Sequence, residues 1–302
     1  MNALNAISVA DLTKSYGKVE ALKKVSFDVE RGEIFALLGP NGSGKTTTLE
    51  ILMGLRSYDN GKISYFNADC GSRKLPRIGA VFQTRVYYDS LSVREHIKYY
   101  SSFYRVRSDI QKYLDLLNLG EKIDAQYAQL SGGQKQQLSI LLALVNEPEI
   151  LFLDEPSTSL DPQVRLKIWE LIRTLKNEGR TIVFSTHYIE EAEALADRVS
   201  ILSKGELIIT DSPANIIKNY NEGYNVELCF DEEMSIAALE DLGVGGVQRR
   251  GSVYSFSVSA IDDALLQSVK DISGKFRVSR INIGKSSLQS VFVKVTEERF
   301  SQ

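Results

Sequence analysis

The segment Gly39-Pro-Asn-Gly-Ser-Gly-Lys-Thr46 constrains the fold of this chain more than any other part of its sequence. The apolar run Ile34 to Leu38 precedes it, as in a strand buried on both faces, and a helix-like stretch to about Leu55 follows. Glycines leave backbone N–H groups free to converge on phosphate oxygens, and a helix N-terminus adds partial positive charge there. The pattern G-x-x-x-x-G-K-[ST] in this setting predicts a nucleotide-phosphate site.

Three side chains at the end of this loop have separate predicted roles. Lys45 should reach the β- and γ-phosphates, and the Thr46 hydroxyl should ligate Mg²⁺. Thr47 is a weaker candidate for a contact with the α-phosphate. The loop alone leaves ATP and GTP open. A flexible Gly/Ser loop before a helix is the alternative interpretation, and the strand–loop–helix setting disfavours it.

Two acids, Asp154 and Glu155, follow the apolar run Ile150 to Leu153. In an open α/β sheet, ligands gather outside the carboxyl ends of the strands, beside the phosphate loop. We therefore predict that Asp154 holds Mg²⁺ through water and that Glu155 orients or deprotonates the attacking water. A strand-end turn with two solvated acids explains these two residues alone about equally well.

A second helix start, Ser131-Gly-Gly-Gln134, opens an apolar helix predicted to run to Val145. Small residues at a helix N-terminus favour anions, yet the phosphate loop already serves that purpose. A second phosphate site is surplus unless it serves a nucleotide held by another copy. The alternative interpretation of these residues is a serine N-cap with a Gly-rich turn.

His187, after the apolar run Thr181 to Ser185, is a candidate to bond a γ-phosphate and the attacking water.

The chain organisation predicts two domains. Buried strands alternating with helices imply a parallel α/β sheet in the first, with a mainly helical stretch over about 87–146. The pattern changes near Ser212-Pro213, beyond which no proline occurs and short strands alternate with short helices. We predict a nucleotide-binding domain over 1–215 and an α+β sandwich over 216–302, with strands at 224–230, 253–258 and 277–283.

Composition excludes several classes of protein. Apolar residues make up 43% and charged residues 25% of the chain, which argues against disorder. No apolar run approaches the roughly 18 residues of a membrane span, and no secretory signal is recognisable, so we expect a cytoplasmic protein. Cys70 and Cys229 are too few for a disulfide framework. The net charge of −3 argues against a dedicated nucleic-acid binder.

Taken together, these residues resemble the nucleotide-binding subunit of an ABC transporter over about residues 5 to 215. The signature LSGGQ of that family is present unchanged at Leu130 to Gln134. The other matching positions are Tyr16 for the aromatic that stacks on adenine, 39–46 for the phosphate loop, Gln83 for the glutamine loop, 150–155 for the second acidic motif, Ser157 to Asp161 for the D-loop, and His187 for the switch histidine.

The resemblance implies a P-loop NTPase core with an antiparallel β subdomain and an α-helical signature subdomain, plus the small C-terminal α+β domain. It implies ATP hydrolysis that energises a separate membrane permease, with the chain held on the inner face of the membrane. Two copies are expected to pack head to tail, with each ATP between Lys45 of one copy and Ser131 and Gly133 of the other.

The resemblance also implies a full set of site residues. Glu155, His187 and Gln83 are the expected catalytic residues, and Thr46, Gln83 and Asp154 the expected Mg²⁺ ligands. ATP is expected to contact Tyr16, Gly39, Pro40, Asn41, Gly42, Ser43, Gly44, Lys45, Thr46 and Thr47 of one subunit, and Ser131, Gly132, Gly133 and Gln134 of the opposite subunit.

A few positions depart from the family pattern. Ser159 stands where many members have glycine, and Gln137 where many have arginine, but neither carries the chemistry. The end of the chain, Ser287 to Thr296, looks like the terminal motif of the drug-resistance and antibiotic-exporter branch, with Gln289 in place of its usual acid. Export is therefore expected.

A soluble ABC ATPase acting on ribosomes or DNA is the alternative function. Such proteins usually carry two ATPase units or long coiled-coil or basic insertions. This chain has one unit and a slightly acidic balance, so we expect no nucleic-acid partner.

A dense group of aromatics follows Gln83, and we predict that part of it lines the groove that accepts a permease while the rest packs inside the helical subdomain. The group comprises Tyr87, Tyr88, Tyr99, Tyr100, Phe103 and Tyr104.

Overall fold

The computed structural model describes residues 5–66, 68–69, 77–83, 87–105, 109–220, 223–231, 235–236, 239, 246–258, 261–285 and 287–297. The chain divides into two compact units, Met1–Pro213 and Ala214–Gln302. Each unit is described by itself. Cys70 lies outside the described residues, and Cys229 is a half-buried free thiol of the second unit.

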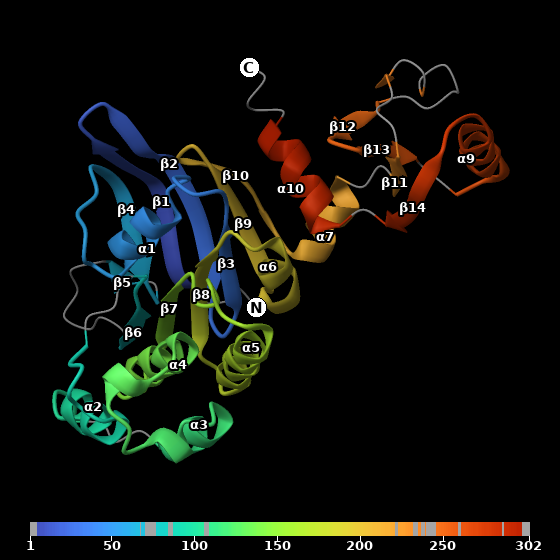
Figure 1. Cartoon of the computed structure of the whole chain (residues 1–302). Helices are drawn as coiled ribbons and strands as arrows, with labels where there is room; N and C mark the ends of the chain where they lie inside the picture. Colours follow the sequence, from blue (N-terminus) through green and yellow to red (C-terminus); the bar gives the residue numbers. More distant parts are fainter. Residues whose placement is uncertain are drawn as a thin grey trace. The chain divides into compact units, whose positions relative to one another are not determined.

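A six-stranded sheet forms the centre of the first unit (Figure 1). Its strands, in spatial order, are β10 (Glu206–Asp211), β9 (Arg198–Ser203), β3 (Ile34–Leu38), β8 (Thr181–Thr186), β7 (Ile150–Asp154) and β6 (Ile78–Val81). All neighbours are parallel except β10, which pairs antiparallel with β9. The register sets Asp154 beside Ser185 and Leu38 beside Thr186, so the carboxyl ends of three central strands meet.

A second, antiparallel sheet covers one side of this core. It contains β2 (Val19–Glu30), β1 (Asn5–Tyr16), β4 (Asn60–Tyr65) and β5 (Ala68–Asp69), in that order. Helix α1 (Lys45–Leu52) lies between the two sheets (Figure 1), and its Leu49 and Ile51 share one buried cluster with Val9 and Phe152. Hydrophobic burial on both sides therefore fixes the helix that starts at the phosphate loop.

Helices α5 (Pro162–Asn177) and α6 (Ile189–Leu195) pack on the other side of the six-stranded sheet (Figure 1). Asp161 caps α5 by accepting hydrogen bonds from the backbone N–H groups of Gln163 and Val164, and Pro162 occupies its first turn. The helix ends before Gly179, whose φ is +82°. An aspartate cap followed by proline and a glycine after the last turn are local sequence signals for the two ends of such a helix.

The predicted helical stretch contains α2 (Val93–Ser101), α3 (Gln111–Leu116) and α4 (Gly132–Ala143) with short 3₁₀ turns between them. Helices α4 and α1 end earlier than predicted. Helix α4 stops at Ala143, and α1 stops at Leu52 because Gly54, with φ +73°, turns the chain away. Leu144 is buried in the turn after α4, so its apolar character reflects packing and not helix.

The second unit is an α+β domain built on one four-stranded antiparallel sheet. The spatial order is β12 (Gln248–Arg250), β13 (Val253–Val258), β11 (Tyr224–Phe230) and β14 (Val278–Lys285). This is the order of a split β-α-β arrangement. Its helices are α7 (Pro213–Asn219), α9 (Asp263–Lys275) and α10 (Leu288–Glu297), and its core contains Val226, Leu228, Tyr254 and Ile272.

Within the described part of the chain, no helix has the length and apolar character that crossing a membrane requires.

Candidate functional site

The loop between β3 and α1 takes a shape that only glycine permits at its ends. Gly44 caps α1 with φ +105°, and a Cβ there would lie 2.7 Å from the Ala21 carbonyl oxygen and from the Leu22 side chain. A Cβ on Gly39 would lie 2.3 Å from the Leu202 carbonyl oxygen. No side chain caps α1, so the N–H groups of its first turn are open to an external anion.

Lys45 lies folded into this loop. Its ammonium donates hydrogen bonds to the carbonyl oxygens of Gly39 at 2.8 Å and Pro40 at 3.0 Å, and it lies 4.0 Å from a carboxylate oxygen of Glu155. Burial lowers the pKa of Lys45, and the nearby carboxylates of Glu155 and Asp154 oppose that shift. The result is a cation held inside the loop, where it can meet phosphate oxygens.

Asp154, at the end of β7, joins three elements. Its Oδ1 accepts hydrogen bonds from the Thr46 hydroxyl at 3.2 Å and from the Ser185 hydroxyl at 2.5 Å. Burial raises the pKa of Asp154, whereas these two hydrogen bonds lower it. The hydroxyl of Thr46 and the carboxylate of Asp154 therefore form a compact set of hard oxygen donors, which suits Mg²⁺.

Glu155 is held in a left-handed conformation with φ +48°. Its backbone N–H donates to the carbonyl oxygen and to the hydroxyl of Ser185, at 3.2 and 3.0 Å. Its Oε1 accepts a hydrogen bond from His187 Nδ1 at 3.1 Å, and its Oε2 accepts one from Thr158 at 3.0 Å. Both carboxylate oxygens are thus oriented by neighbouring side chains, as a residue that positions a water requires.

An open hollow of about 730 Å³ connects these groups. It is lined by Tyr16, Lys18, Val19, Glu20, Ala21, Lys23, Asn41, Gly42, Gly44, Lys45, Thr46, Thr47, Gln83, Glu155 and Lys204. Tyr16 stands at the hollow with 41% of its surface exposed, and cations of Lys14 and Arg56 lie over its ring. An exposed ring beside a phosphate loop offers a stacking surface for a base.

The predicted residues fall into two groups. The structure gathers Tyr16, Gln83, the loop and its flanking threonines around the hollow, with Asp154 and His187 bonded to its wall. Ser131 to Gln134 do not line it. There Ser131 Oγ accepts from the Gln134 N–H at 3.2 Å while Gln134 Oε1 accepts from the Ser131 N–H at 2.9 Å, a capping box.

Comparison with known proteins gives one consistent answer. A sequence profile of the ABC transporter family matches residues 22–158. An uncharacterised ABC transporter ATP-binding protein of Synechocystis sp. is 32% identical over 98% of this chain and 86% of its own length. The Nod factor export ATP-binding protein I of Rhizobium sp. is 33% identical over 96% of this chain and 97% of its own.

A solved structure agrees with the sequence relatives. The dimeric structure of a bacterial ABC transporter cassette superposes with a TM-score of 0.62 at 30% identity, over 68% of this chain and 98% of the other. The same cassette, in a post-hydrolysis dimer bound to ADP and Pi, superposes with a TM-score of 0.61.

This chain belongs to the ABC transporter family. It is an ATP-binding subunit and an ATPase, with the P-loop NTPase core that the sequence predicted. Cassettes of this family dimerise and act with a membrane partner. The alternative of a ribosome- or DNA-directed ATPase is not favoured by any of these relatives.

A buried hydroxyl of the phosphate loop bears on its ligand. Ser43 is buried, and its hydroxyl has no hydrogen-bond partner among the residues that the structure describes. A buried hydroxyl without a partner is costly, so a group that completes its hydrogen bonding is favoured there. Together with the folded-in cation of Lys45 and the open first turn of α1, this hydroxyl indicates a site built for phosphate.

Sequence reasoning missed two residues of this ABC site. Ser185 bonds both acids, and Thr158 bonds Glu155. Ser185 ends a predicted strand. If that strand pairs in parallel with the strand that ends at the acids, Ser185 lies beside them, so sheet topology can identify it. Thr158 has only its spacing of three residues from Glu155 to mark it. Lys18 and Lys204 line the hollow without any motif around them.

Proposed function

We propose that this protein is the ATPase subunit of an exporter, acting as a head-to-tail homodimer on the cytoplasmic face of a separate permease. The observation that carries this proposal is that Lys45 and Glu155 line one hollow, with Asp154 and His187 hydrogen-bonded to residues of its wall. Export is supported by the Nod factor export relative, whose match covers both units of this chain.

Binding comes first in the proposed mechanism. The open first turn of α1 and the ammonium of Lys45 hold the β- and γ-phosphates, and Tyr16 stacks on the adenine. Thr46, Asp154 and Gln83 would hold Mg²⁺, which neutralises charge that develops on the phosphates. Lys45 exchanges its bonds to the loop carbonyls for bonds to phosphate oxygens, so the loop keeps its shape.

Hydrolysis then depends on the orientation of one carboxylate. Glu155 accepts hydrogen bonds at both oxygens from His187 and Thr158, and its backbone is fixed by Ser185. A carboxylate held in this way orients the attacking water and accepts its proton. His187, on the carboxyl end of β8, is placed to move from Glu155 to the γ-phosphate.

The helix end at Ser131 supports the dimer part of the proposal. It lies outside the hollow of its own chain, and its Gly132 has space for a Cβ with nothing within 4 Å. A helix N-terminus with small residues, even one that carries its own cap, suits an anion presented from outside. In a head-to-tail pair, Ser131, Gly132, Gly133 and Gln134 would meet ATP held by the partner's phosphate loop.

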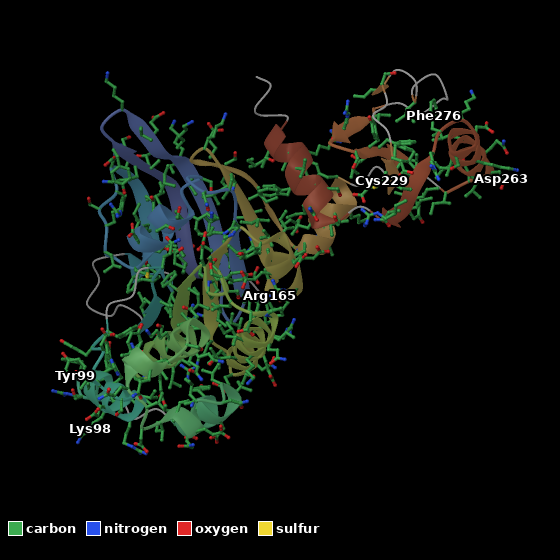
Figure 2. The ribbon with its side chains drawn as sticks, viewed as in Figure 1. Lys98, Tyr99, Arg165, Cys229, Asp263 and Phe276 are labelled. Carbon is green, nitrogen blue, oxygen red and sulfur yellow. The ribbon has the colours of Figure 1, made fainter. Side chains whose placement is uncertain are left out.

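Exposed aromatic rings on the helical segment support a permease contact. Tyr88 is 55% exposed, Tyr99 39% and Phe103 63%, and Tyr99 packs edge-on against the other two rings. Figure 2 shows Tyr99 beside Lys98 on the outer side of α2. Tyr87 is different, because its ring packs among His96, Tyr100 and Tyr127. Tyr88 is therefore a candidate contact, and Tyr87 is a packing residue.

Replacing the proposed base tests the activity. Glu155→Gln should lower kcat by a factor of roughly 10² to 10⁴ while ATP binding persists. Glu190→Gln, an exposed acid in the first turn of α6, is the matched control and should retain turnover. Steady-state phosphate release from the purified transporter measures both. Undiminished turnover in Glu155→Gln would show that another group activates the water.

Removing the exposed rings tests the partner. The double variant Tyr88→Ala, Phe103→Ala should lose co-purification with a multi-span membrane protein in mild detergent and keep its ATPase activity. Tyr99→Leu provides a milder comparison at the centre of the same patch. If the variant still carries a stoichiometric membrane partner, the contact lies elsewhere. Recovery of wild type with ribosomes or DNA would instead contradict the transporter assignment of this chain.

A further inference from the structure

Gln136 is a polar side chain in the buried part of α4, two residues beyond the signature motif. It is 1% exposed, and the helix around it packs Leu138, Ile140 and Leu141 into the core. A buried amide in an apolar setting requires hydrogen-bond partners for both ends of its side chain.

Among the residues that the structure describes, only one end of this amide has a partner. The Nε2 of Gln136 donates a 2.8 Å hydrogen bond to the backbone carbonyl oxygen of Pro156, and its Oε1 is buried without a partner. A methionine or leucine would fill similar volume without an unpaired oxygen. What the amide contributes beyond packing is therefore its bond to Pro156.

Pro156 directly follows the catalytic glutamate, so this bond fixes the backbone one residue beyond Glu155. Glu155 has φ +48°, a conformation that a non-glycine residue adopts only when its surroundings impose it. Ser185 fixes the N–H side of Glu155 through two bonds, and Gln136 fixes the carbonyl of the next residue. The glutamate is clamped from β8 on one side and from α4 on the other.

The first turn of α4 is also in close contact with the segment beyond Glu155. A Cβ on Gly133 would lie 3.0 Å from a methyl carbon of Val164, in the first turn of α5. A displacement of α4 along its axis therefore presses on the 155–164 segment at two places. The helix that carries the signature and the loop that carries the base are mechanically joined within one chain.

We propose that Gln136 is a positioning residue that ties the signature end of α4 to Glu155 of the same chain. A nucleotide bound to the signature end by the partner subunit thereby sets the alignment of Glu155 at this chain's own ATP. The inference rests on the proposed head-to-tail dimer, and it assigns a direction to the coupling, from the partner's nucleotide to the base of this chain.

Substitution of adjacent amides provides the first test. Gln136→Met should lower kcat roughly 10- to 100-fold, because catalysis is sensitive to small misplacements of a reacting group, with KM little changed. Its melting temperature should stay equal or rise, since the unpaired oxygen is removed. Gln137→Met is the matched control: Gln137 is 3% exposed in the same helix turn, and its side chain makes no hydrogen bond within the described part of the chain.

The ATP dependence of turnover tests the coupling. Wild type should show a Hill coefficient above 1, up to the limit of two sites, and Gln136→Met should approach 1. Lower kcat with unchanged cooperativity in Gln136→Met would overturn the link to the partner's nucleotide. An equal loss in Gln136→Met and Gln137→Met, or a fall in melting temperature that accompanies it, would reduce Gln136 to a packing residue.

Mixed dimers from two differently tagged chains identify the chain in which Gln136 acts. A Gln136→Met chain paired with a Glu155→Gln chain should be almost inactive, because its only working glutamate lies beside the altered residue. With both changes in one chain and a wild-type partner, about half of wild-type turnover should remain. The reverse ranking would show that Gln136 acts on the partner's site and overturn the inference.

Failure of the dimer proposal gives a different result. If wild type hydrolyses ATP with a Hill coefficient of 1 and Ser131→Arg keeps full turnover, the signature end does not bind the partner's nucleotide. The proposed coupling to Glu155 is then wrong as well. If both wild-type cooperativity and the Ser131→Arg defect are present while Gln136→Met behaves as wild type, only the role of Gln136 is wrong.

Discussion

Two helix N-termini in this protein carry glycine and small residues, but a side chain caps only one of the two. Helix α1 begins at Gly44 in a left-handed conformation with no side-chain cap, inside the hollow. Helix α4 begins at Ser131 with a complete capping box to Gln134, outside the hollow. One end leaves its backbone N–H groups open, whereas the other satisfies its own.

Because of this difference, the two helix ends bind an anion under different conditions. The α1 end depends on an external phosphate to complete its hydrogen bonds. The α4 end is complete in the isolated chain, so a phosphate must compete with the Ser131 hydroxyl for the Gln134 N–H. Binding at α1 is thus built into one subunit, and binding at α4 is expected only when a partner brings its nucleotide into place.

Replacing the glycine at each helix start by alanine should produce the largest difference between the two ends, in both folding stability and ATP binding. Gly44→Ala forces a Cβ to 2.7 Å from the Ala21 carbonyl oxygen at φ +105°, and should cost about 3 kcal/mol of folding free energy and abolish ATP binding. Gly132→Ala meets nothing within 4 Å and should keep both the fold and ATP binding by its own hollow. Denaturation curves and equilibrium binding of ATP measure this.

The comparison of the two helix ends would fail if Gly44→Ala bound ATP normally. It would also fail if Gly132→Ala lost ATP binding in the separate subunit, because the α4 end would then belong to the same site. Reduced turnover of Gly132→Ala with intact binding is the expected pattern for an end that serves the partner.

A change of pH should alter the stability of the strand that leads to α1 and leave the stability of helix α4 unchanged. Glu33, directly before β3, is 7% exposed; burial raises its pKa to about 7, with the Glu30 N–H and Arg198 opposing. Because the folded pKa exceeds the unfolded value, the stabilisation is complete below about pH 4.5 and is lost as pH rises through 7. Helix α4 contains no acid or histidine.

We expect the free energy of unfolding to fall by on the order of 2 kcal/mol between pH 5 and 8 through Glu33. Glu33→Gln should remove this component, and urea denaturation of both proteins across the range measures it. A pH profile that persists unchanged in Glu33→Gln would assign the titration to another group.

Removal of the serine cap should destabilise the fold less than Gly44→Ala or the titration of Glu33. Ser131→Ala loses the side-chain bond to the Gln134 N–H and should destabilise the fold by about 1 kcal/mol. ATP affinity of the separate subunit should remain at the wild-type value, while turnover of the dimer falls. Thermal unfolding and ATP binding on the same preparation distinguish these effects. Weaker ATP binding without a partner would place Ser131 in its own chain's site.

Much of the site was predictable because its signals are local. The phosphate loop, the acids after β7 and His187 after β8 each follow an apolar run, and parallel register then brings strand ends together. The clamp on Glu155 was not predictable in this way, since Gln136 and Ser185 reach it across 20 and 30 positions. Contacts of that kind depend on how helices and strands pack.

The fold shows the same division between local and tertiary information. The capping box at Ser92 and the proline start of α5 are determined by neighbouring residues, so they are visible in the sequence. The early end of α4 is not visible there, because Leu144 is apolar on account of its burial in the turn that follows the helix. For Ser131, the N-cap interpretation describes the structure of one chain, and the anion interpretation remains a proposal for the dimer.

Lys45 ties the two ends of the phosphate loop together. Its ammonium, at the start of α1, donates to the carbonyls of Gly39 and Pro40 at the end of β3, so the protein's own bonds hold the shape of the loop. Each catalytic cycle can therefore begin from an already shaped receptor. The speed of reloading should be limited by arrival of ATP and by separation of the two subunits, and not by refolding of the loop.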